Sequence, residues 1–285
     1  MSKVSFYEED GKKFLKISVS KAKQFKQCKK AFKFNYIDHL PKITRDYHVL
    51  GTFCHEVLEK FHKAYIDKSE LAFNDEMNIA WKSSIKSHRK NITPEIKAEA
   101  KDMIGKYLKL ITEKKNKGEN FNVISVEDNF KKELDGKVIL NGMIDRIQQD
   151  PDGVLHVADY KTTKNKKYLK DDWFQLLTYC YVLLMDNPSL EKIRASYILL
   201  RHDFEYIGRD FTREEILETK NEFMSIYEEM IKEEEFPPSP TFLCSYCDFL
   251  KDENGNIICE EGAEFVNKTG RRSKKDDTKF GIVSW

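Results

Sequence analysis

The amino-acid sequence predicts an α/β fold with a central mixed β-sheet flanked by helices. Helical spacing of apolar residues dominates the chain up to Gly118, and β-branched runs then alternate with helical stretches in the order strands, helix, strands, helix. Such alternation suits a sheet with helices packed on its faces. With 285 residues, of which 40% are hydrophobic, the chain is long enough to bury a sizeable core without disulfides. We expect one elaborated domain over residues 1–266.

The N-terminal part is expected to be helical. Residues 18–36 place apolar side chains at helical spacing, and Cys28 lies on that apolar face. A second helix is expected to open near Thr52, its N-cap, with His55 beside the apolar stripe. Residues from about 70 to 118 again show helical spacing, which predicts a helical insertion packed over the core.

The strand region is organised around one predicted hairpin. Val138–Ile147 and Val154–Lys161 are β-branched and apolar, and Asp150-Pro151-Asp152-Gly153 between them suits a tight turn. A turn centred there places Asp145 opposite Asp159 or the residue before it. Like charges at such positions, about 5 Å apart, are destabilising unless something offsets them.

A divalent metal ion would offset the charges of these two aspartates. Carboxylate oxygens suit Mg²⁺ or Mn²⁺. Lys161 follows Asp159 by two positions and therefore points to the same face of the strand, beside any substrate that the metal binds. The alternative is a solvated hairpin with scattered charges, but the run around Asp145 is too apolar for a surface ribbon.

Further elements complete the expected core. Gln175 and Tyr179 are four residues apart and share one face of a mostly apolar helix. The predicted elements are a strand over Asn122–Lys131, that helix over Tyr168–Met185, strands over Ala195–Arg201 and Glu205–Phe211, and an amphipathic helix over Thr212–Glu234.

The cysteines form a second signal. A CxxC pair and one later cysteine lie in the segment 237–260, and such a pair in an intracellular chain indicates metal or redox chemistry. With one cysteine from the N-terminal helix, the possible ligands are Cys28, Cys244, Cys247 and Cys259. Four thiolates suit a tetrahedral zinc or a 4Fe-4S cluster, and spacing alone does not choose between them. Cys54 and Cys180 sit among apolar neighbours and are expected in the core.

Bulk properties favour a cytoplasmic protein with reduced thiols and no membrane partner. No apolar run approaches the roughly 18 residues of a membrane span, and the N-terminal MSKVSFYEEDGKK has no signal-peptide hydrophobic region. The net charge of +1 does not by itself indicate nucleic-acid binding. The runs Ser18–Arg45 and Lys161–Lys170 are nevertheless basic, either as a groove or as solvated faces. Residues 267–285 are expected to form a flexible tail.

Several motifs together resemble one enzyme family. Gly142-x-x-Asp145 followed by Asp159-Tyr160-Lys161-Thr162 resembles the PD-(D/E)xK nuclease superfamily, in particular its RecB-type branch. That branch includes helicase-associated nuclease domains, CRISPR-associated adaptation nucleases and phage exonucleases. Gly51-Thr52-x-x-His55 and Gln175-x-x-x-Tyr179 are similar to two further motifs of the branch. The motifs occur in the family's order over nearly the whole chain.

The resemblance implies a restriction-endonuclease-like core and hydrolysis of DNA phosphodiesters with Mg²⁺ or Mn²⁺. The implied metal ligands are His55, Asp145, Asp159 and the backbone carbonyl of Tyr160. The implied catalytic residues are Lys161, Asp145 and Asp159, and Gln175 and Tyr179 would contact DNA. In the family's pattern Glu127 lies near the edge of the site, although a solvated strand glutamate is an equal alternative.

The cysteine pattern is similar to that of RecB-type nucleases with a 4Fe-4S cluster, and a structural Zn²⁺ is the alternative. Eleven residues separate Cys247 from Cys259, where relatives are usually tighter. The sequence Asp252-Glu253-Asn254-Gly255 predicts a small inserted turn that leaves the last ligand in place.

The expected function is that of a DNA exonuclease, of a kind that phages also encode, acting on linear or single-stranded ends in replication, recombination or repair. A helicase or a recombination protein is the expected partner. Two alternatives are a CRISPR adaptation nuclease that processes spacers, and a non-catalytic DNA-binding component of a helicase-nuclease assembly. The chain has no G-x-x-x-x-G-K-[ST] sequence and so no ATP motor of this type.

Overall fold

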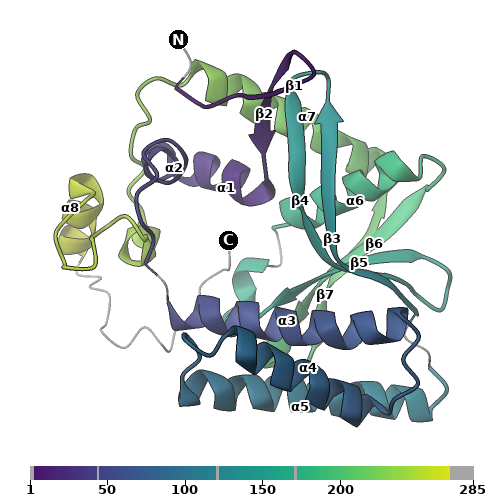
Figure 1. Cartoon of the computed structure of the whole chain (residues 1–285). Coiled ribbons are helices and arrows are strands. Elements are labelled where there is room, and N and C mark those ends of the chain that lie inside the picture. The colour runs from purple at the N-terminus through teal and green to yellow at the C-terminus, as the bar shows by residue number, and fades with distance from the viewer. Residues whose placement is uncertain (1–2, 44, 120–121, 170–171, 270–285) are drawn as a thin grey trace. The chain divides into compact units, whose positions relative to one another are not determined.

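The computed structural model describes residues 3–43, 45–119, 122–169 and 172–269 (Figure 1). The strands in these ranges are β1 (Tyr7–Glu9), β2 (Lys12–Ile17), β3 (Asn122–Leu134), β4 (Val138–Gln149), β5 (Leu155–Lys161), β6 (Lys192–Leu199) and β7 (Glu205–Thr212). The α-helices are α1 (Val19–Gln27), α2 (Lys29–Tyr36), α3 (Asp46–Ile66), α4 (Phe73–Ser87), α5 (Pro94–Asn116), α6 (Phe174–Asp186), α7 (Arg213–Lys232) and α8 (Glu260–Thr269). Short 3-10 helices are η1 (Lys166–Leu169), η2 (Leu200–His202) and η3 (Phe242–Tyr246).

The strands form a mixed sheet. Hydrogen bonds join them in the order β1-β2-β4-β5-β6-β7, and β3 pairs with β4. The pairs β1/β2, β4/β5 and β6/β7 are antiparallel, whereas β2/β4 and β5/β6 are parallel. The predicted α/β class with a central mixed sheet and flanking helices is confirmed.

The chain divides into two compact units, and we describe each by itself. The first unit contains the described residues of Met1–Thr44, Lys131–Gly142 and Lys220–Lys279, and the second contains those of Arg45–Phe130 and Met143–Thr219. The single domain expected over residues 1–266 stays a prediction.

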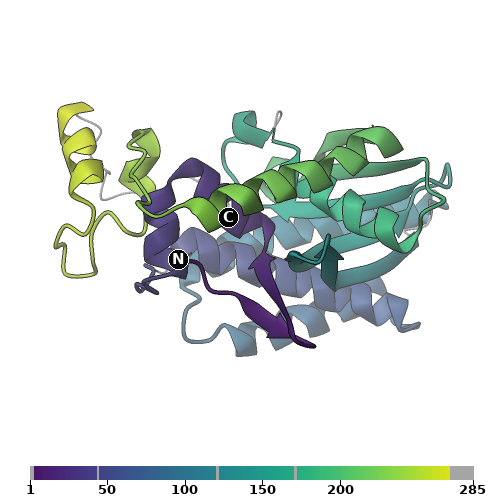
Figure 2. The ribbon, with the colours of Figure 1, turned by 90° about the horizontal axis from the view of Figure 1, so that it is seen from above.

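In the first unit, the helix predicted over residues 18–36 is two helices. Ser18 caps α1, because its Oγ accepts a hydrogen bond from the Lys21 backbone N–H at 3.2 Å. Cys28 has an extended backbone with φ −159° and separates α1 from α2. Figure 2 shows the C-terminal segment, coloured yellow-green to yellow, on the same side as these purple helices.

In the second unit, three helices and the face of β5 and β6 that carries Ala158, Tyr160 and Ile198 share one apolar core. The helices α3, α4 and α5 lie against one another (Figure 1), and the last two form the predicted helical stretch of residues 70–118. Thr93 caps α5 through its hydroxyl, with Pro94 at the first helical position. The predicted start of α3 at Thr52 is wrong, since the helix begins at Asp46 and the Thr52 hydroxyl donates to the His48 carbonyl within it.

Two other predicted boundaries differ from the structure. The helix expected from Tyr168 begins only at Phe174, after the 3-10 turn η1. The expected tail of residues 267–285 begins inside α8, which ends at Thr269, and its remainder lies outside the described residues. In the part of the chain that is described, we find no helix both long and apolar enough to traverse a bilayer.

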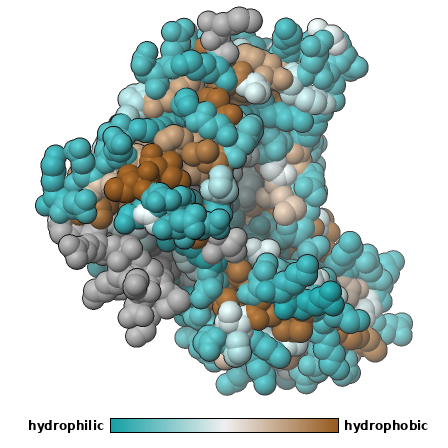
Figure 3. Space-filling model, turned by 60° about the vertical axis from the view of Figure 1, so that its left-hand side comes forward, coloured by the Kyte–Doolittle hydropathy of each residue, from teal (hydrophilic) through white to brown (hydrophobic). Residues whose placement is uncertain are grey.

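The surface near the C-terminal segment carries exposed apolar side chains. Figure 3 brings forward the side of Figure 1 on which α8 lies and shows apolar side chains gathered there among hydrophilic ones. Phe242 in η3 and Ile257 are among the exposed large apolar residues of this segment.

Candidate active site

The β4–β5 hairpin sets the frame of the candidate site. Its turn is closed by a hydrogen bond from the Gly153 N–H to the Asp150 carbonyl, as expected for a turn centred on Pro151 and Asp152. Arg146 pairs with Ala158 in the antiparallel register. Asp145 directly precedes Arg146 on β4, one position further from the turn, and its Oδ2 accepts a hydrogen bond from the Tyr160 N–H at 2.8 Å. The two strands therefore bring Asp145 next to the Asp159-Tyr160-Lys161 run.

Three side chains from three elements converge on one point. His55 on α3, Glu127 on β3 and Asp145 on β4 offer ligand atoms that all lie within 4.8 Å of one another. His55 Nδ1 lies 3.3 Å from Asp145 Oδ2, and its Nε2 lies 3.0 Å from the carbonyl oxygen of Tyr160. We call these three residues the metal-ligand group.

Glu127 is the member whose role sequence reasoning left open. Its backbone has a positive φ of +48°, which interrupts the regular alternation of β3. Alternation along the strand therefore does not reveal which way its carboxylate points. The resemblance to the family put Glu127 near the edge of the site, with a solvated strand glutamate as an equal alternative.

The electrostatics of the metal-ligand group favour a cation. Burial, and next the charge of Asp145, raise the pKa of Glu127 to about 8. Burial and the nearby Asp159 likewise raise the pKa of Asp145, although His55 and Lys161 oppose this shift. The two crowded carboxylates supply the hard oxygen ligands that Mg²⁺ and Mn²⁺ prefer, and the imidazole adds one nitrogen ligand. The donor set therefore fits Mg²⁺ or Mn²⁺.

Asp159 and Lys161 lie beside this group and are held by each other and by α6. Lys161 Nζ forms an ion pair with Asp159 Oδ2 at 2.7 Å. Gln175 Oε1 accepts from Lys161 Nζ at 3.0 Å, and Gln175 Nε2 donates to Asp159 Oδ1 at 2.7 Å. The same amide nitrogen donates to the Tyr179 hydroxyl at 2.8 Å. The structure thus brings the predicted Gln175 and Tyr179 to Asp159 and Lys161, and their contact with DNA stays a prediction.

Gly51 on α3 lies close to the residue that follows β5. A Cβ atom at Gly51 would lie 3.4 Å from the Thr162 hydroxyl oxygen, directly after Lys161 in the chain. The glycine of the Gly51-Thr52-x-x-His55 motif is thus near the end of the strand that carries Lys161.

A buried cation supports the same two strands from the opposite face of the sheet. Arg146 is fully buried, and its guanidinium donates to the hydroxyls of Tyr160 at 3.0 Å, Tyr206 at 3.1 Å and Tyr107 at 3.3 Å. Because Arg146 follows Asp145 and Tyr160 follows Asp159, this contact ties together the backbones that carry the two aspartates.

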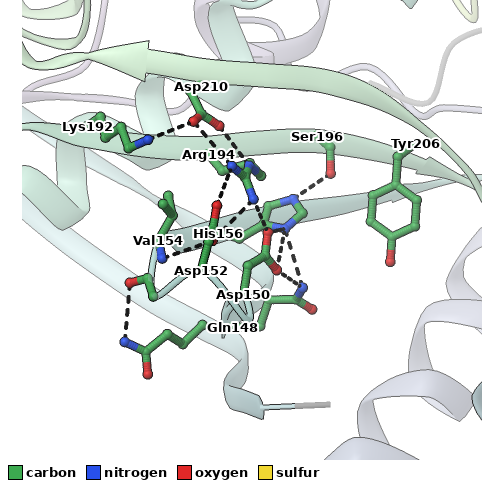
Figure 4. Close-up of polar contacts among 12 residues, drawn as sticks. Gln148, Asp150, Asp152, Val154, His156, Lys192, Arg194, Ser196, Tyr206 and Asp210 are labelled. Atoms are coloured by element: carbon green, nitrogen blue, oxygen red, sulfur yellow. Dashed lines mark hydrogen bonds and ion pairs between the residues drawn. The ribbon is translucent and has the colours of Figure 1, made fainter. Parts of the chain in front are cut away.

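A second acidic cluster lies at the turn end of the hairpin. Arg194 on β6 forms ion pairs with Asp150 at 2.8 Å, Asp152 at 3.0 Å and Asp210 at 2.7 Å. The buried His156 joins it, with Nδ1 3.0 Å from Asp150 Oδ2. Figure 4 shows the three carboxylates pointing toward Arg194 from the turn and from β7, and His156 on β5 pointing toward Asp150. We call this cluster the arginine network.

In the first unit, the four predicted cluster cysteines line one pocket. The four cysteines are Cys28, Cys244, Cys247 and Cys259. Phe34, Pro238 and Leu250 also line the pocket. Burial, and then the neighbouring thiols Cys28 and Cys244, raise the pKa of Cys247 to about 12. A Cβ atom at Gly262 would lie 3.3 Å from Cys259 Sγ and 3.6 Å from Cys244 Sγ. The absence of a side chain there keeps room between the thiols, so the residues fit a thiolate-bound metal centre.

The remaining two cysteines are buried in the second unit. Cys54 on α3 and Cys180 on α6 have no exposed surface. Burial raises the pKa of Cys54 to about 12 and also raises that of Cys180. They lie in apolar surroundings, as the sequence predicted.

Comparison with known proteins decides the family. A sequence model of the PD-(D/E)XK nuclease superfamily matches residues 16–251, which is most of the chain. The chain belongs to the PD-(D/E)XK nuclease superfamily. The match includes His55, Asp145 and Lys161, and it ends before Cys259.

Curated relatives of this superfamily member match over a short stretch. An ATP-dependent helicase/deoxyribonuclease subunit from Streptococcus pyogenes serotype M49 (strain NZ131) is 40% identical over 48 residues, and the proteins of the same name from serotypes M4 (strain MGAS10750) and M1 match equally. The match covers 17% of this chain and 4% of each relative. This chain therefore spans a small part of the relatives' length.

A solved structure supports the fold of this PD-(D/E)XK protein. The crystal structure of a "Putative exonuclease" from Eubacterium rectale aligns with a TM-score of 0.50 and 14% identity, over 81% of this chain and 86% of the other. At this identity the likeness concerns the fold alone.

Proposed function

We propose that the protein is a metal-dependent DNA nuclease of the RecB type that removes nucleotides from DNA ends. The observation that carries the proposal is the metal-ligand group beside Lys161: an imidazole and two carboxyl groups with raised pKa values, next to a buried ammonium. Membership of the PD-(D/E)XK superfamily supports the nuclease activity.

His55, Glu127 and Asp145 would hold Mg²⁺ or Mn²⁺, with Asp159 and the Tyr160 carbonyl as the further ligands expected from the sequence. When bound, such an ion polarises the scissile phosphate and lowers the pKa of a water molecule. Glu127 is an addition to the ligands expected from the sequence.

The remaining site residues act on charge and position. Lys161 is the cation next to the substrate phosphate, where it stabilises the negative charge that grows in the transition state. Gln175 fixes both Lys161 and Asp159 through its two ends, which keeps the ammonium oriented. Outer partners of this kind typically contribute 10- to 100-fold to metal affinity or activity.

The exonuclease part of the proposal draws on the names of two similar proteins, the "Putative exonuclease" and the helicase/deoxyribonuclease subunit. The second name also suggests a helicase as partner. The test uses purified full-length protein with end-labelled linear DNA and with closed circular DNA, each with Mg²⁺, Mn²⁺ or EDTA. Loss of label from linear DNA only, and only with metal, supports the proposal. Nicking of the circle would replace the exonuclease by an endonuclease, and no cleavage of either DNA would reject nuclease activity.

We also propose that the cysteine pocket binds a 4Fe-4S cluster. Four thiols at one pocket, with a glycine where a side chain would crowd two of them, support this assignment. Such a centre would join the α1–α2 junction at Cys28 to the C-terminal segment within the first unit, so we expect its role to be structural. Iron and acid-labile sulfide should be found in anaerobically prepared protein and should be lost in Cys28→Ser, Cys244→Ser, Cys247→Ser and Cys259→Ser. The matched control Cys54→Ser should keep both. Stoichiometric zinc without iron would replace the cluster by the zinc alternative.

A further inference from the structure

The Lys161 ammonium lies over the ring of Tyr197, in addition to its two polar contacts. The ammonium contacts Asp159 Oδ2 and Gln175 Oε1, and the centroid of the Tyr197 ring lies 5.3 Å from Nζ. A cation within about 6 Å of a ring centroid is attracted to the ring face, more strongly where water is excluded. Lys161 is only 5% exposed, so water screens this attraction little.

We propose that Tyr197 is a positioning residue that holds the Lys161 ammonium in the active site through its ring face. The inference rests on the proposed catalytic role of Lys161. It adds a third partner to the ammonium, one that is neutral and leaves the charge of Lys161 available to the substrate, whereas Asp159 partly neutralises that charge.

The strand register places Tyr197 on the correct face of the sheet. Tyr197 on β6 pairs with Asp159 on β5 in the parallel register. Paired residues of neighbouring strands project to the same face, and Asp159 and Lys161 share a face because they are two positions apart. Tyr197 therefore extends to the side where the lysine lies.

The ring is held in place by its own contacts. Its hydroxyl donates to the Asp172 carbonyl at 2.7 Å, and the ring lies nearly parallel to Trp173, with centroids 6.4 Å apart and an interplanar angle of 11°. Tyr197 is fully buried, and burial followed by the charge of Asp159 raises its pKa well above the usual range. The side chain thus remains a neutral phenol with a fixed ring face.

This geometry predicts which measured quantity changes when the ring is removed. When the Tyr197 ring is removed, the Lys161 ammonium keeps its contacts with Asp159 and Gln175 but can move into the space that the ring occupied. It is then less well placed for the transition state. The rate of the chemical step should fall, while Mn²⁺ affinity and DNA affinity should not change.

The first test compares Tyr197→Leu, Tyr197→Phe and the control Phe211→Leu. Phe211 is also fully buried and contacts Trp173, with centroids 5.7 Å apart, so Phe211→Leu measures the cost of truncating the same aromatic cluster. We expect Tyr197→Leu to lower kcat by about 3- to 30-fold, the range of a desolvated cation–π contact, with KM and the Mn²⁺ Kd within about twofold. Tyr197→Phe keeps the ring and should restore most of the rate. A kcat in Tyr197→Leu that equals that of Phe211→Leu would overturn the inference.

The second test does not need activity. In full-length protein carrying ¹³C at the lysine ε-carbons, the Lys161 resonance is assigned by its loss in Lys161→Arg. The ring current of Tyr197 should shift this resonance, and the shift should remain in Tyr197→Phe and vanish in Tyr197→Leu. An unchanged resonance in Tyr197→Leu would refute the contact. If the wild-type protein cleaves no DNA while the ring shift behaves as expected, the proposed function fails and the contact between ring and ammonium stands.

Discussion

The two ends of the β4–β5 hairpin both carry acidic side chains, but only one end balances their charge. At the turn end, the carboxylates of Asp150, Asp152 and Asp210 surround the guanidinium of Arg194 (Figure 4). Hydrogen bonds from Arg194 lower the pKa of Asp152 and of Asp210. Burial opposes the shift for Asp150, yet hydrogen bonds from Gln148 and Arg194 and the nearby His156 still lower its pKa.

At the other end, burial and mutual repulsion raise the pKa values of Glu127 and Asp145. Lys161 pairs with Asp159 at this end, and His55 lies 3.3 Å from Asp145, yet the pKa of Asp145 stays raised. The contrast teaches that a count of acidic residues does not identify a metal site. Carboxylates whose charge is already met stabilise the fold, whereas carboxylates left unbalanced are available to a metal ion.

The largest expected effect is that of Asp145→Asn. It removes a ligand of the metal-ligand group, so cleavage should fall by more than the roughly 10- to 100-fold that loss of an outer partner costs. The metal-free protein should become more stable, because the repulsion with Asp159 and Glu127 is relieved. Single-turnover cleavage and thermal unfolding in EDTA measure the two effects. Retained cleavage would remove Asp145 from the site.

Arg194→Met should have the next largest effect, and it should act on stability alone. It removes the guanidinium that all three carboxylates share, while His156 stays beside Asp150 and Lys192 stays beside Asp210. The free energy of unfolding should fall by about 1–3 kcal/mol. Denaturant unfolding measures the loss, and Lys109→Met, which removes an exposed lysine, is the control. Cleavage well below the melting temperature should be unchanged; a loss of cleavage there would show that the two ends are coupled.

The two clusters should make opposite contributions to the pH dependence of stability in EDTA. Glu127 has a folded-state pKa of about 8 against an ordinary 4.5, so the folded protein binds more protons between these values. Stability should therefore fall as the pH rises from about 4.5 to about 8. Asp150 has a lowered pKa in the folded protein. Its ionised carboxylate therefore stabilises the fold above the ordinary pKa of 3.8, and this stabilisation is lost as the pH falls below that value. Urea unfolding across this pH range measures the free energy of unfolding. The loss of stability between about pH 4.5 and about pH 8 should be smaller in Glu127→Gln, and smaller in the wild-type protein when saturating Mn²⁺ replaces EDTA. An unreduced loss in Glu127→Gln would assign it to another group.

The smallest effect is expected from Asp152→Asn. Asp152 is the exposed member of the arginine network, with 51% of its side chain accessible, and exposed ion pairs contribute about 0–1 kcal/mol. Stability and cleavage should both stay close to wild type. A loss of cleavage in this variant would contradict the separation of the two clusters.

Sequence reasoning went furthest where a local pattern decides the structure. The alternation in β4 and β5, together with the turn at Pro151, was enough to place Asp145 beside the Asp159-Tyr160-Lys161 run. For Glu127 the family resemblance indicated the edge of the site, but alternation did not give the direction of its side chain, because its positive φ breaks the pattern. Tyr197 was missed because its contact with Lys161 depends on the parallel register of two distant strands.

Helix boundaries failed for a different reason. The apolar spacing of residues 18–36 continues across Cys28, although the backbone there is extended. The hydroxyl of Thr52 looks the same in sequence whether it caps a helix or, as here, bonds to the carbonyl of the preceding turn. In both cases the deciding information lies in backbone geometry that the side-chain pattern does not contain.

The turn between Cys247 and Cys259 has a consequence for protein engineering. Lys251 and Ile257 pair across it, and the Ile258 N–H donates to the Leu250 carbonyl at 3.0 Å. The two ends of the loop between Lys251 and Ile257 therefore lie side by side. Within the loop, the Asp252 carboxylate accepts hydrogen bonds from the backbone N–H groups of Asn254 and Asn256. The number of residues between the two cysteines is therefore largely independent of the distance between their sulfur atoms. An affinity tag or a fluorophore-bearing loop inserted at Asn254-Gly255 would lengthen this excursion and leave the thiol pocket in place.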